Sequence, residues 1–200
     1  MVMIASSRGR STAHLDEILK NERSCIPPEI DRLHRVFHDL RYEGKIHFGE
    51  NLKEMKETVR VLKKKLFELM YDEEKFLFPF LILHVPRLQP LICLLLSEHQ
   101  DFKRSLKNLR IELLNLGKKT GEGSHILIQK INDEVTYFIC LLRSHLWMEN
   151  KNIYRVINRE LNSNEKDKLL MRLVQYEMRF DQPIHNGQKH TRGFLNGKIS

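Results

Sequence analysis

The fold is indicated most clearly by one stretch of the chain, INDEVTYFICLLRSHLWMENKNIYRV (residues 131–156). Its apolar side chains recur every three or four positions, which is the pattern of a helix with one buried face. The positions on this stripe are Ile131, Val135, Phe138, Leu142, His145, Glu149, Ile153 and Val156. His145 and Glu149 are four residues apart, so they share one helix face. An imidazole and a carboxylate on a buried face need a partner, because burying them without one is costly.

Other stretches carry the same kind of interrupted stripe. One runs through Leu52, Met55, Val59, Leu62, Leu66, Leu69, Glu73, Phe76 and Phe80, another through His99, Phe102, Leu106, Leu109 and Leu113, and a shorter one through Leu15, Leu19, Glu22 and Ile26. Each stripe contains one side chain of a type that binds metals, namely Glu73, His99 or Glu22. One such side chain on an apolar stripe can be explained as an isolated structural feature. Such side chains on several stripes are harder to explain in that way.

These stripes, and the prolines and glycines between them, predict an all-α protein. Helices are expected at residues 13–26, 29–42, 48–83, 88–116 and 124–161, with a short additional C-terminal helix at 165–180. Pro27 and Pro28 either stop the first helix or only kink it. Long amphipathic helices with short connections predict an antiparallel four-helix bundle. We divide the chain into this bundle (13–161), a helix that packs on it (162–180) and a disordered basic tail (181–200), which is polar and aperiodic.

Composition and charge argue against several classes of protein. No run of about 18 apolar residues is present, so no membrane-spanning segment is expected. The three cysteines are far apart and the N-terminus lacks an apolar signal segment, which favours a reducing, cytoplasmic location. The net charge of +8 is spread along the chain, and we interpret it as solvated helix surface rather than as a nucleic-acid site. The sequence contains no phosphate-binding loop and no nucleophile motif that would indicate a hydrolase. Nothing in the sequence indicates the oligomeric state.

Two interpretations of the buried polar side chains are open from spacing alone. In the first they bind a metal, since bundle interiors hold iron sites built from inward-facing histidine and glutamate. Imidazole and carboxylate together suit iron, and manganese and zinc are alternatives. In the second interpretation the same side chains form a buried hydrogen-bonded network, with Arg23 as counter-charge.

Three short motifs resemble those of a known family. YDEEKFLFP (71–79) is similar to the second-helix box H-x-x-x-E-E-x-x-L-F-P of hemerythrin-like (HHE) domains. SEH (97–99) resembles their third-helix E-H, and HLWMENKNIY (145–154) resembles their fourth-helix box H-x-x-x-E-N-x-x-L-F. The Glu-Asn form of the last box is most similar to the RIC branch, the di-iron proteins that repair iron–sulfur centres. Weaker similarities near the N-terminus extend the match to residues 13–160.

The resemblance implies a metal centre in which two carboxylates bridge the ions. Glu73 and Glu149 match the bridging carboxylates of the family. His99 and His145 match the histidine ligands of the third and fourth helices. These four residues are therefore the expected ligands of one iron ion.

The second metal position is weaker in this chain. The family's second-helix histidine falls at Leu69, which cannot bind a metal, and its first-helix histidine falls near Glu22 and Arg23. Glu22 is the candidate replacement ligand. His38 matches an extra histidine that some RIC proteins place near the metals; His34, one turn earlier, competes for that role, and both are equally well explained as surface residues. We therefore expect one well-supported iron position beside a weakened or empty one.

The resemblance implies a non-heme iron-binding protein rather than a classical enzyme. A labile iron site would serve the repair of iron–sulfur clusters, or a nitrosative or oxidative stress response in which nitric oxide or oxygen meets the metal. Iron–sulfur proteins are then the expected partners. The alternative is a metal-free, degenerate relative that acts as a regulatory or protein-binding module. Leu69 and the missing first-helix histidine favour the alternative, whereas the intact fourth-helix box disfavours it.

Overall fold

The protein is all-α, as predicted. The computed structural model describes residues 15–21, 23–42, 47–118 and 122–180, and these are helical apart from short turns. The α-helices are α2 (Ile26–Tyr42), α3 (Phe48–Asp72), α4 (Phe78–His84), α5 (Gln89–Leu116), α6 (Glu122–Met148), α7 (Arg155–Glu160) and α8 (Ser163–Phe180). Between them lie two π-helical segments, η1 (Glu73–Leu77) and η3 (Glu149–Tyr154), and a 3-10 turn, η2 (Pro86–Leu88). None of the described helices is long and apolar enough to cross a bilayer.

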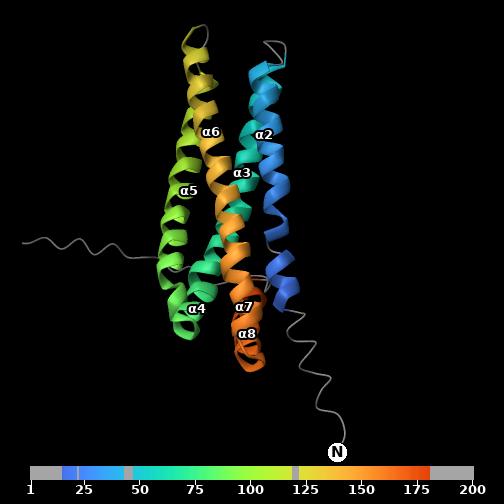
Figure 1. Ribbon diagram of the computed structural model, residues 1–200. Coiled ribbons are helices and arrows are strands. Elements are labelled where there is room, and N and C mark those ends of the chain that lie inside the picture. Colours follow the sequence, from blue (N-terminus) through green and yellow to red (C-terminus); the bar gives the residue numbers. More distant parts are fainter. Residues whose placement is uncertain (1–14, 22, 43–46, 119–121, 181–200) are drawn as a thin grey trace, which may run out of the picture.

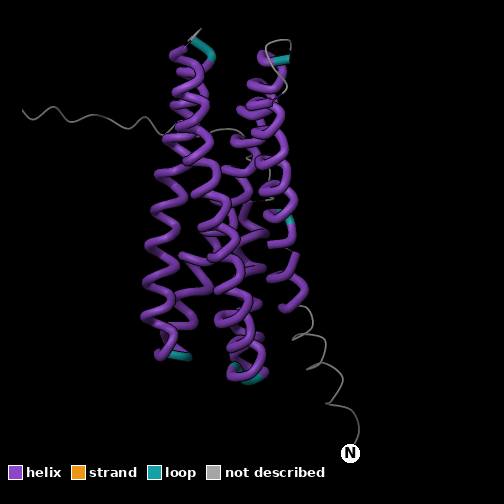
Figure 2. Tube along the Cα trace, turned by 45° about the horizontal axis from the view of Figure 1, so that its top comes forward, coloured by secondary structure: helices purple, strands orange, loops and turns teal. Residues whose placement is uncertain are grey.

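Four long helices form an antiparallel bundle (Figure 1). α2 and α3 lie side by side and run in opposite directions, as do α5 and α6. Because α2 packs on α3 and α6, and α5 packs on the same two helices, the bundle closes. Figure 2 shows the same arrangement from a tilted direction, with most of the loop residues at the two ends of the bundle. The predicted four-helix bundle with an additional C-terminal helix is thus confirmed.

Pro27 and Pro28 do not separate two helices. Residues 15–21 are helical, Cys25 forms a turn, and α2 begins at Ile26 rather than at the predicted Glu29. The two prolines therefore lie in the first turn of α2. Proline is tolerated there because the N–H groups of that turn have no acceptor within the helix.

The two longest predicted helices each contain one wide turn. The predicted helix at 48–83 consists of α3, η1 and α4, and the predicted helix at 124–161 consists of α6, η3 and α7. Each π-helical segment begins at a glutamate, Glu73 in η1 and Glu149 in η3. A π turn holds one more residue than an α turn, and such turns are frequent at functional sites.

The wide turn in η1 corrects one predicted core position. Phe76 was expected on the buried stripe but is only partly buried, whereas Leu77 and Phe78 are each 1% exposed. The reason is that one extra residue rotates the following side chains by about 100° around the helix axis. Sequence periodicity assumes α-helical turns throughout and does not anticipate this rotation.

A polar layer divides the core into two parts. The larger part is built by α2, α3, α5 and α6, and the smaller part by the N-terminal residues, α4, α7 and α8, with the adjoining ends of α5 and η3. Along α5, Leu95 belongs to the smaller part and Phe102 to the larger part, and His99 lies between them. α6 continues directly into η3, and on this continuous helix His145 and Glu149 lie at the same level as His99, between the two parts of the core. The interruptions of three of the stripes, at Glu73, at His99 and at His145 with Glu149, therefore meet in one layer.

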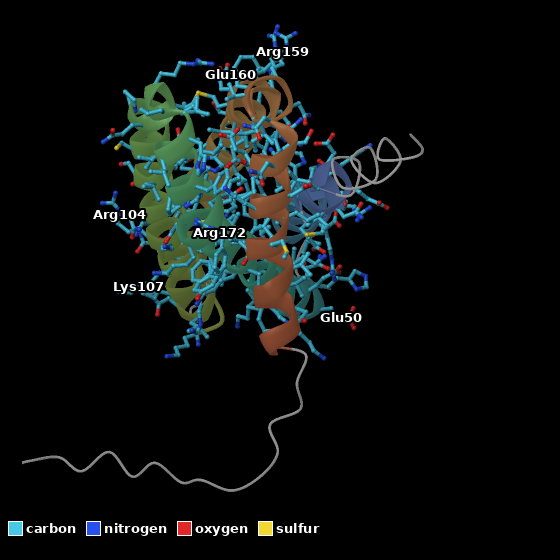
Figure 3. The ribbon with its side chains drawn as sticks, turned by 90° about the horizontal axis from the view of Figure 1, so that it is seen from below. Glu50, Arg104, Lys107, Arg159, Glu160 and Arg172 are labelled. Atoms are coloured by element: carbon cyan, nitrogen blue, oxygen red, sulfur yellow. The ribbon has the colours of Figure 1, made fainter. Side chains whose placement is uncertain are left out.

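α8 covers the smaller part of the core. Leu169 and Leu173 are buried in it, and the guanidinium carbon of Arg172 lies 5.4 Å from the ring centroid of Phe80 in α4. Figure 3, which views the molecule from below, labels Arg172 on the side of α8 that faces α4. The division of the chain at residue 162 stays a prediction, and the predicted tail at 181–200 lies outside the described residues.

Replacing Leu33 by alanine tests the larger part of the core. Leu33 lies in α2 and is fully buried, so we expect its truncation to lower the free energy of unfolding by about 2–5 kcal/mol. Urea unfolding followed by circular dichroism measures the loss. Leu114→Ala on α5 is the control, because Leu114 is 47% exposed and its truncation should have a much smaller effect. Equal losses in the two variants would contradict the assigned core.

Candidate metal centre

Four side chains that bind metals in other proteins meet in the polar layer. We call Glu73, His99, His145 and Glu149 the buried tetrad. One ligand atom from each residue lies within 4.8 Å of those of the other three. Their exposed fractions are 2%, 0%, 2% and 0%, respectively. Two of them come from α-helices α5 and α6, and the two glutamates open the π-helical segments.

The ligand atoms of the buried tetrad converge on a single point. The Nε2 atoms of His99 and His145 are 3.2 Å apart. His99 Nε2 lies 3.4 Å from Oε2 of Glu73, and His145 Nε2 lies 3.4 Å from Oε1 of Glu149. Both imidazoles therefore direct the same nitrogen toward each other, with a carboxylate beside each one.

The opposite nitrogen of each histidine is held by a second carboxylate. His99 Nδ1 lies 3.0 Å from Oε1 of Glu74, and His145 Nδ1 lies 2.7 Å from Oε2 of Glu98. Lys103 donates a hydrogen bond of 2.9 Å to the same oxygen of Glu74. A carboxylate can only accept, so it favours the proton on Nδ1 and leaves the lone pair on Nε2. This is the carboxylate–histidine arrangement that orients metal ligands.

The geometry of the tetrad fits a metal ion. With both Nδ1 atoms protonated, two Nε2 lone pairs face each other at 3.2 Å, and they repel unless a cation or a proton lies between them. Within the described part of the chain, neither buried oxygen of Glu149 makes a hydrogen bond of good geometry. Two imidazoles and two carboxylates form a donor set that suits iron, manganese or zinc.

Burial and the neighbouring charges shift the pKa values of the two histidines in opposite directions. Burial, aided by the charge of His145, lowers the pKa of His99 to about 4. Burial also acts to lower the pKa of His145, but Glu149 and Glu98 outweigh it and the pKa is raised. Burial acts to raise the pKa of Glu149, yet His145 and Arg23 keep that pKa below its ordinary value. A metal that binds both Nε2 atoms would displace any proton held between them.

The structure brings together four of the six predicted metal-site residues. His38 is not among them: its side chain is 61% exposed and lies beside Asp39 and Tyr42 on the surface of α2. Glu22 lies outside the described residues. Leu69 is buried one turn before Glu73, in the larger part of the core. The ligand roles of all six residues stay predictions.

Glu74 and Glu98 were not predicted from the sequence to be partners of the histidines. Each is adjacent in sequence to one tetrad residue but contacts another, since Glu74 follows Glu73 and contacts His99, and Glu98 precedes His99 and contacts His145. The only sequence signal for them is that Glu74 lies inside the motif at 71–79 and Glu98 inside the motif at 97–99. Which histidine each one reaches depends on how the helices are rotated against one another.

Replacing Glu98 by glutamine should weaken metal binding without removing a ligand. The loss of the carboxylate at His145 Nδ1 is expected to lower the affinity about 10–100-fold, because it no longer fixes the tautomer or raises the basicity of the ring. Competition with a chromophoric chelator measures the affinity. Glu54→Gln is the matched control, since Glu54 is exposed on α3 and lies beside Arg32. Equal affinity in both variants would show that Glu98 does not support a metal ligand.

Comparison with known protein families agrees with this site. Residues 13–157 match the family model described as the hemerythrin HHE cation binding domain. The matched span is more than half of the chain and contains the whole buried tetrad. A comparison with curated proteins gives no match.

Proposed function

This chain belongs to the hemerythrin HHE cation-binding family, and we propose that it is a non-heme iron-binding protein that holds one iron ion in the buried tetrad. The observation that supports this most strongly is the pair of Nε2 atoms 3.2 Å apart, each backed by a carboxylate at Nδ1. Two imidazole lone pairs held in this way suit a shared cation. Iron is favoured over manganese and zinc by the resemblance of the motif at 71–79 to hemerythrin-like domains and of the motif at 145–154 to their RIC branch.

The tetrad residues would hold the ion, and the aromatic residues around them would exclude water. Glu73 and Glu149 supply negative charge, and the histidines supply neutral nitrogen donors. Phe102 packs edge-on against His145 with ring centroids 5.1 Å apart, and Phe78 stacks on His99 at 5.7 Å. Bound iron would offer an open coordination position at which a small ligand such as nitric oxide or oxygen binds. The protein's own contribution is a dry, oriented donor set.

We propose further that the iron is cargo for the repair of iron–sulfur clusters. This role is supported by the similarity of the motif at 145–154 to the RIC branch. The tetrad offers two imidazoles, which is fewer than a full hemerythrin-like site would use. Because fewer imidazoles hold an iron ion less firmly, this favours reversible binding of the iron. A cavity of about 480 Å³ has a lining that includes Leu19, Arg23, Leu146 and Tyr154 but no tetrad residue. Arg23 connects this cavity with the tetrad, because it also contacts Glu149.

Metal analysis of the purified protein tests the iron proposal. The protein is loaded anaerobically with Fe(II), desalted and analysed for metal content and thermal stability. We expect one iron per chain and a higher midpoint of unfolding than in the metal-free protein, since an ion that binds only the folded state stabilises it. A protein that stays metal-free, with an unfolding midpoint unchanged by iron, would exclude this function.

One observation favours a second function, that of a metal-free regulatory or protein-binding module. Arg23 Nη2 lies 3.3 Å from Oε2 of Glu149, so part of the charge of the layer is balanced within the chain. Hydrogen-bonded networks of this kind can be rigid and fully satisfied. This function predicts that the protein is equally stable in iron-loading and chelating buffers, which is the opposite result in the same experiment.

A further inference from the structure

Arg23 reaches into the polar layer from the N-terminal segment. It is 8% exposed, and Nη2 lies 3.3 Å from Oε2 of Glu149 and donates a hydrogen bond of 3.0 Å to the carbonyl oxygen of Leu146. Nη1 donates a hydrogen bond of 2.8 Å to Oδ1 of Asn150. The guanidinium carbon lies 4.0 Å from the ring centroid of Tyr154. Four contacts therefore fix the guanidinium in one place.

Each carboxylate oxygen of Glu149 faces a different positively charged group or a place for one. Its Oε1 faces the Nε2 of His145, on the side where the tetrad would hold an ion, and its Oε2 faces Arg23. A carboxylate that bridges two metals has the same arrangement, with one ion at each oxygen. Here a guanidinium lies beside Oε2 of Glu149, and a guanidinium has only donors and cannot act as a metal ligand.

The charges of the layer balance with a single divalent ion. Among the described residues, the negative charges of the layer come from four carboxylates, Glu73, Glu74, Glu98 and Glu149. Arg23 and Lys103 supply two positive charges through their contacts with Glu149 and Glu74, and one divalent ion supplies the other two. A second divalent ion would leave an uncompensated charge in a buried layer, which is strongly unfavourable.

Among the described residues, which do not include Glu22, no replacement ligand lies at the second position. Leu69, one turn before Glu73, is buried hydrocarbon and belongs to the larger part of the core. At Glu149 Oε2 the contact is with Arg23, whose guanidinium offers donors and no lone pair. The described part of the site therefore has one set of metal ligands and a fixed cation beside it.

We propose that Arg23 is a built-in counter-cation that takes the place of a second metal, so that the site binds one ion per chain. This inference rests on the proposed metal-binding function and deepens it. In the metal-free protein Arg23 keeps Glu149 paired. In the loaded protein it occupies the far side of Glu149 and limits the site to a single ion.

The first test is the number of ions and their separation. The wild-type protein is loaded with excess Fe(II) for metal analysis, and with excess Mn(II) for electron paramagnetic resonance. We expect one ion per chain and the hyperfine pattern of an isolated Mn(II). Two ions per chain, or the spectrum of a spin-coupled pair, would overturn the role of Arg23 while leaving the metal-binding function intact. No bound ion would overturn both proposals.

The second test removes the guanidinium and supplies it again from solution. In Arg23→Ala we expect the unfolding midpoint of the metal-free protein to fall by at least about 5 °C, because Glu149 loses its buried partner. Metal affinity should rise at least about tenfold, because a positive charge near the ion is gone. Millimolar guanidinium chloride should reverse both changes, since the cavity of about 480 Å³ that Arg23 lines gives access to the vacated position.

Arg143→Ala is the matched control. Arg143 forms an exposed ion pair of 2.8 Å with Asp31, so its removal should change neither metal affinity nor the response to guanidinium. Arg23→Lys keeps the charge and should still bind one ion, which gives a readout if Arg23→Ala does not fold. The proposal is overturned if Arg23→Ala matches Arg143→Ala in stability and affinity, or if Arg23→Lys binds two ions.

Discussion

Replacing His145 by alanine should weaken metal binding by at least about a hundredfold, or about 2.8 kcal/mol. His145 supplies one of the two Nε2 atoms that converge in the buried tetrad. Since loss of a supporting carboxylate alone lowers affinity by about 10–100-fold, loss of a ligand should exceed it. Anaerobic competition between the protein and a chromophoric chelator for Fe(II) measures the change.

His38→Ala is the control for this experiment, and it also tests an open prediction. Because His38 is exposed on α2 and absent from the tetrad, we expect its replacement to leave metal affinity unchanged. A loss of affinity in His38→Ala would instead place this histidine near the metal, as the RIC resemblance suggested. Wild-type affinity in His145→Ala would show that His145 is not a metal ligand and that the metal binds outside the tetrad.

Replacing Glu149 by leucine should lower the free energy of unfolding of the metal-free protein by about 3–5 kcal/mol. The change leaves the Arg23 guanidinium buried without its carboxylate. Urea unfolding in the presence of a chelator measures the loss. Glu54→Leu at an exposed position of α3 is the control for the same change of residue type.

The double variant Arg23→Leu, Glu149→Leu separates the ion pair from other effects. Replacing both members of a buried ion pair by apolar residues is often neutral, so the double variant should recover most of the stability lost in Glu149→Leu. A loss below about 1 kcal/mol in the single variant would show that the Arg23–Glu149 contact is not a stabilising ion pair.

The helices and their buried faces were predictable because each long stripe repeats every three or four residues. The same argument predicted that Glu73, His99, His145 and Glu149 face the core. It could not show that they share one level, because that depends on how far each helix slides along its neighbours. The structure supplies this register, with His99 and His145 of different helices brought to 3.2 Å.

Other features depend on contacts between segments far apart in the sequence. The π-helical turns at Glu73 and Glu149 interrupt a pattern that sequence periodicity treats as uniform. The contacts of Glu74 and Glu98 join residues 25 and 47 positions apart. Arg23 was anticipated as a counter-charge in a buried network with the tetrad residues. That its guanidinium faces the far oxygen of Glu149 required the three-dimensional arrangement.

An anomalous-scattering map of crystals grown anaerobically with Fe(II) shows whether the buried tetrad binds iron. We expect a single anomalous peak per chain at the iron edge, within bonding distance of His99 Nε2 and His145 Nε2 and of the carboxylates of Glu73 and Glu149. The Arg23 guanidinium should remain beside Glu149 in the same crystals. A tetrad without a peak, or a peak bound by other residues, would contradict the assignment of this site.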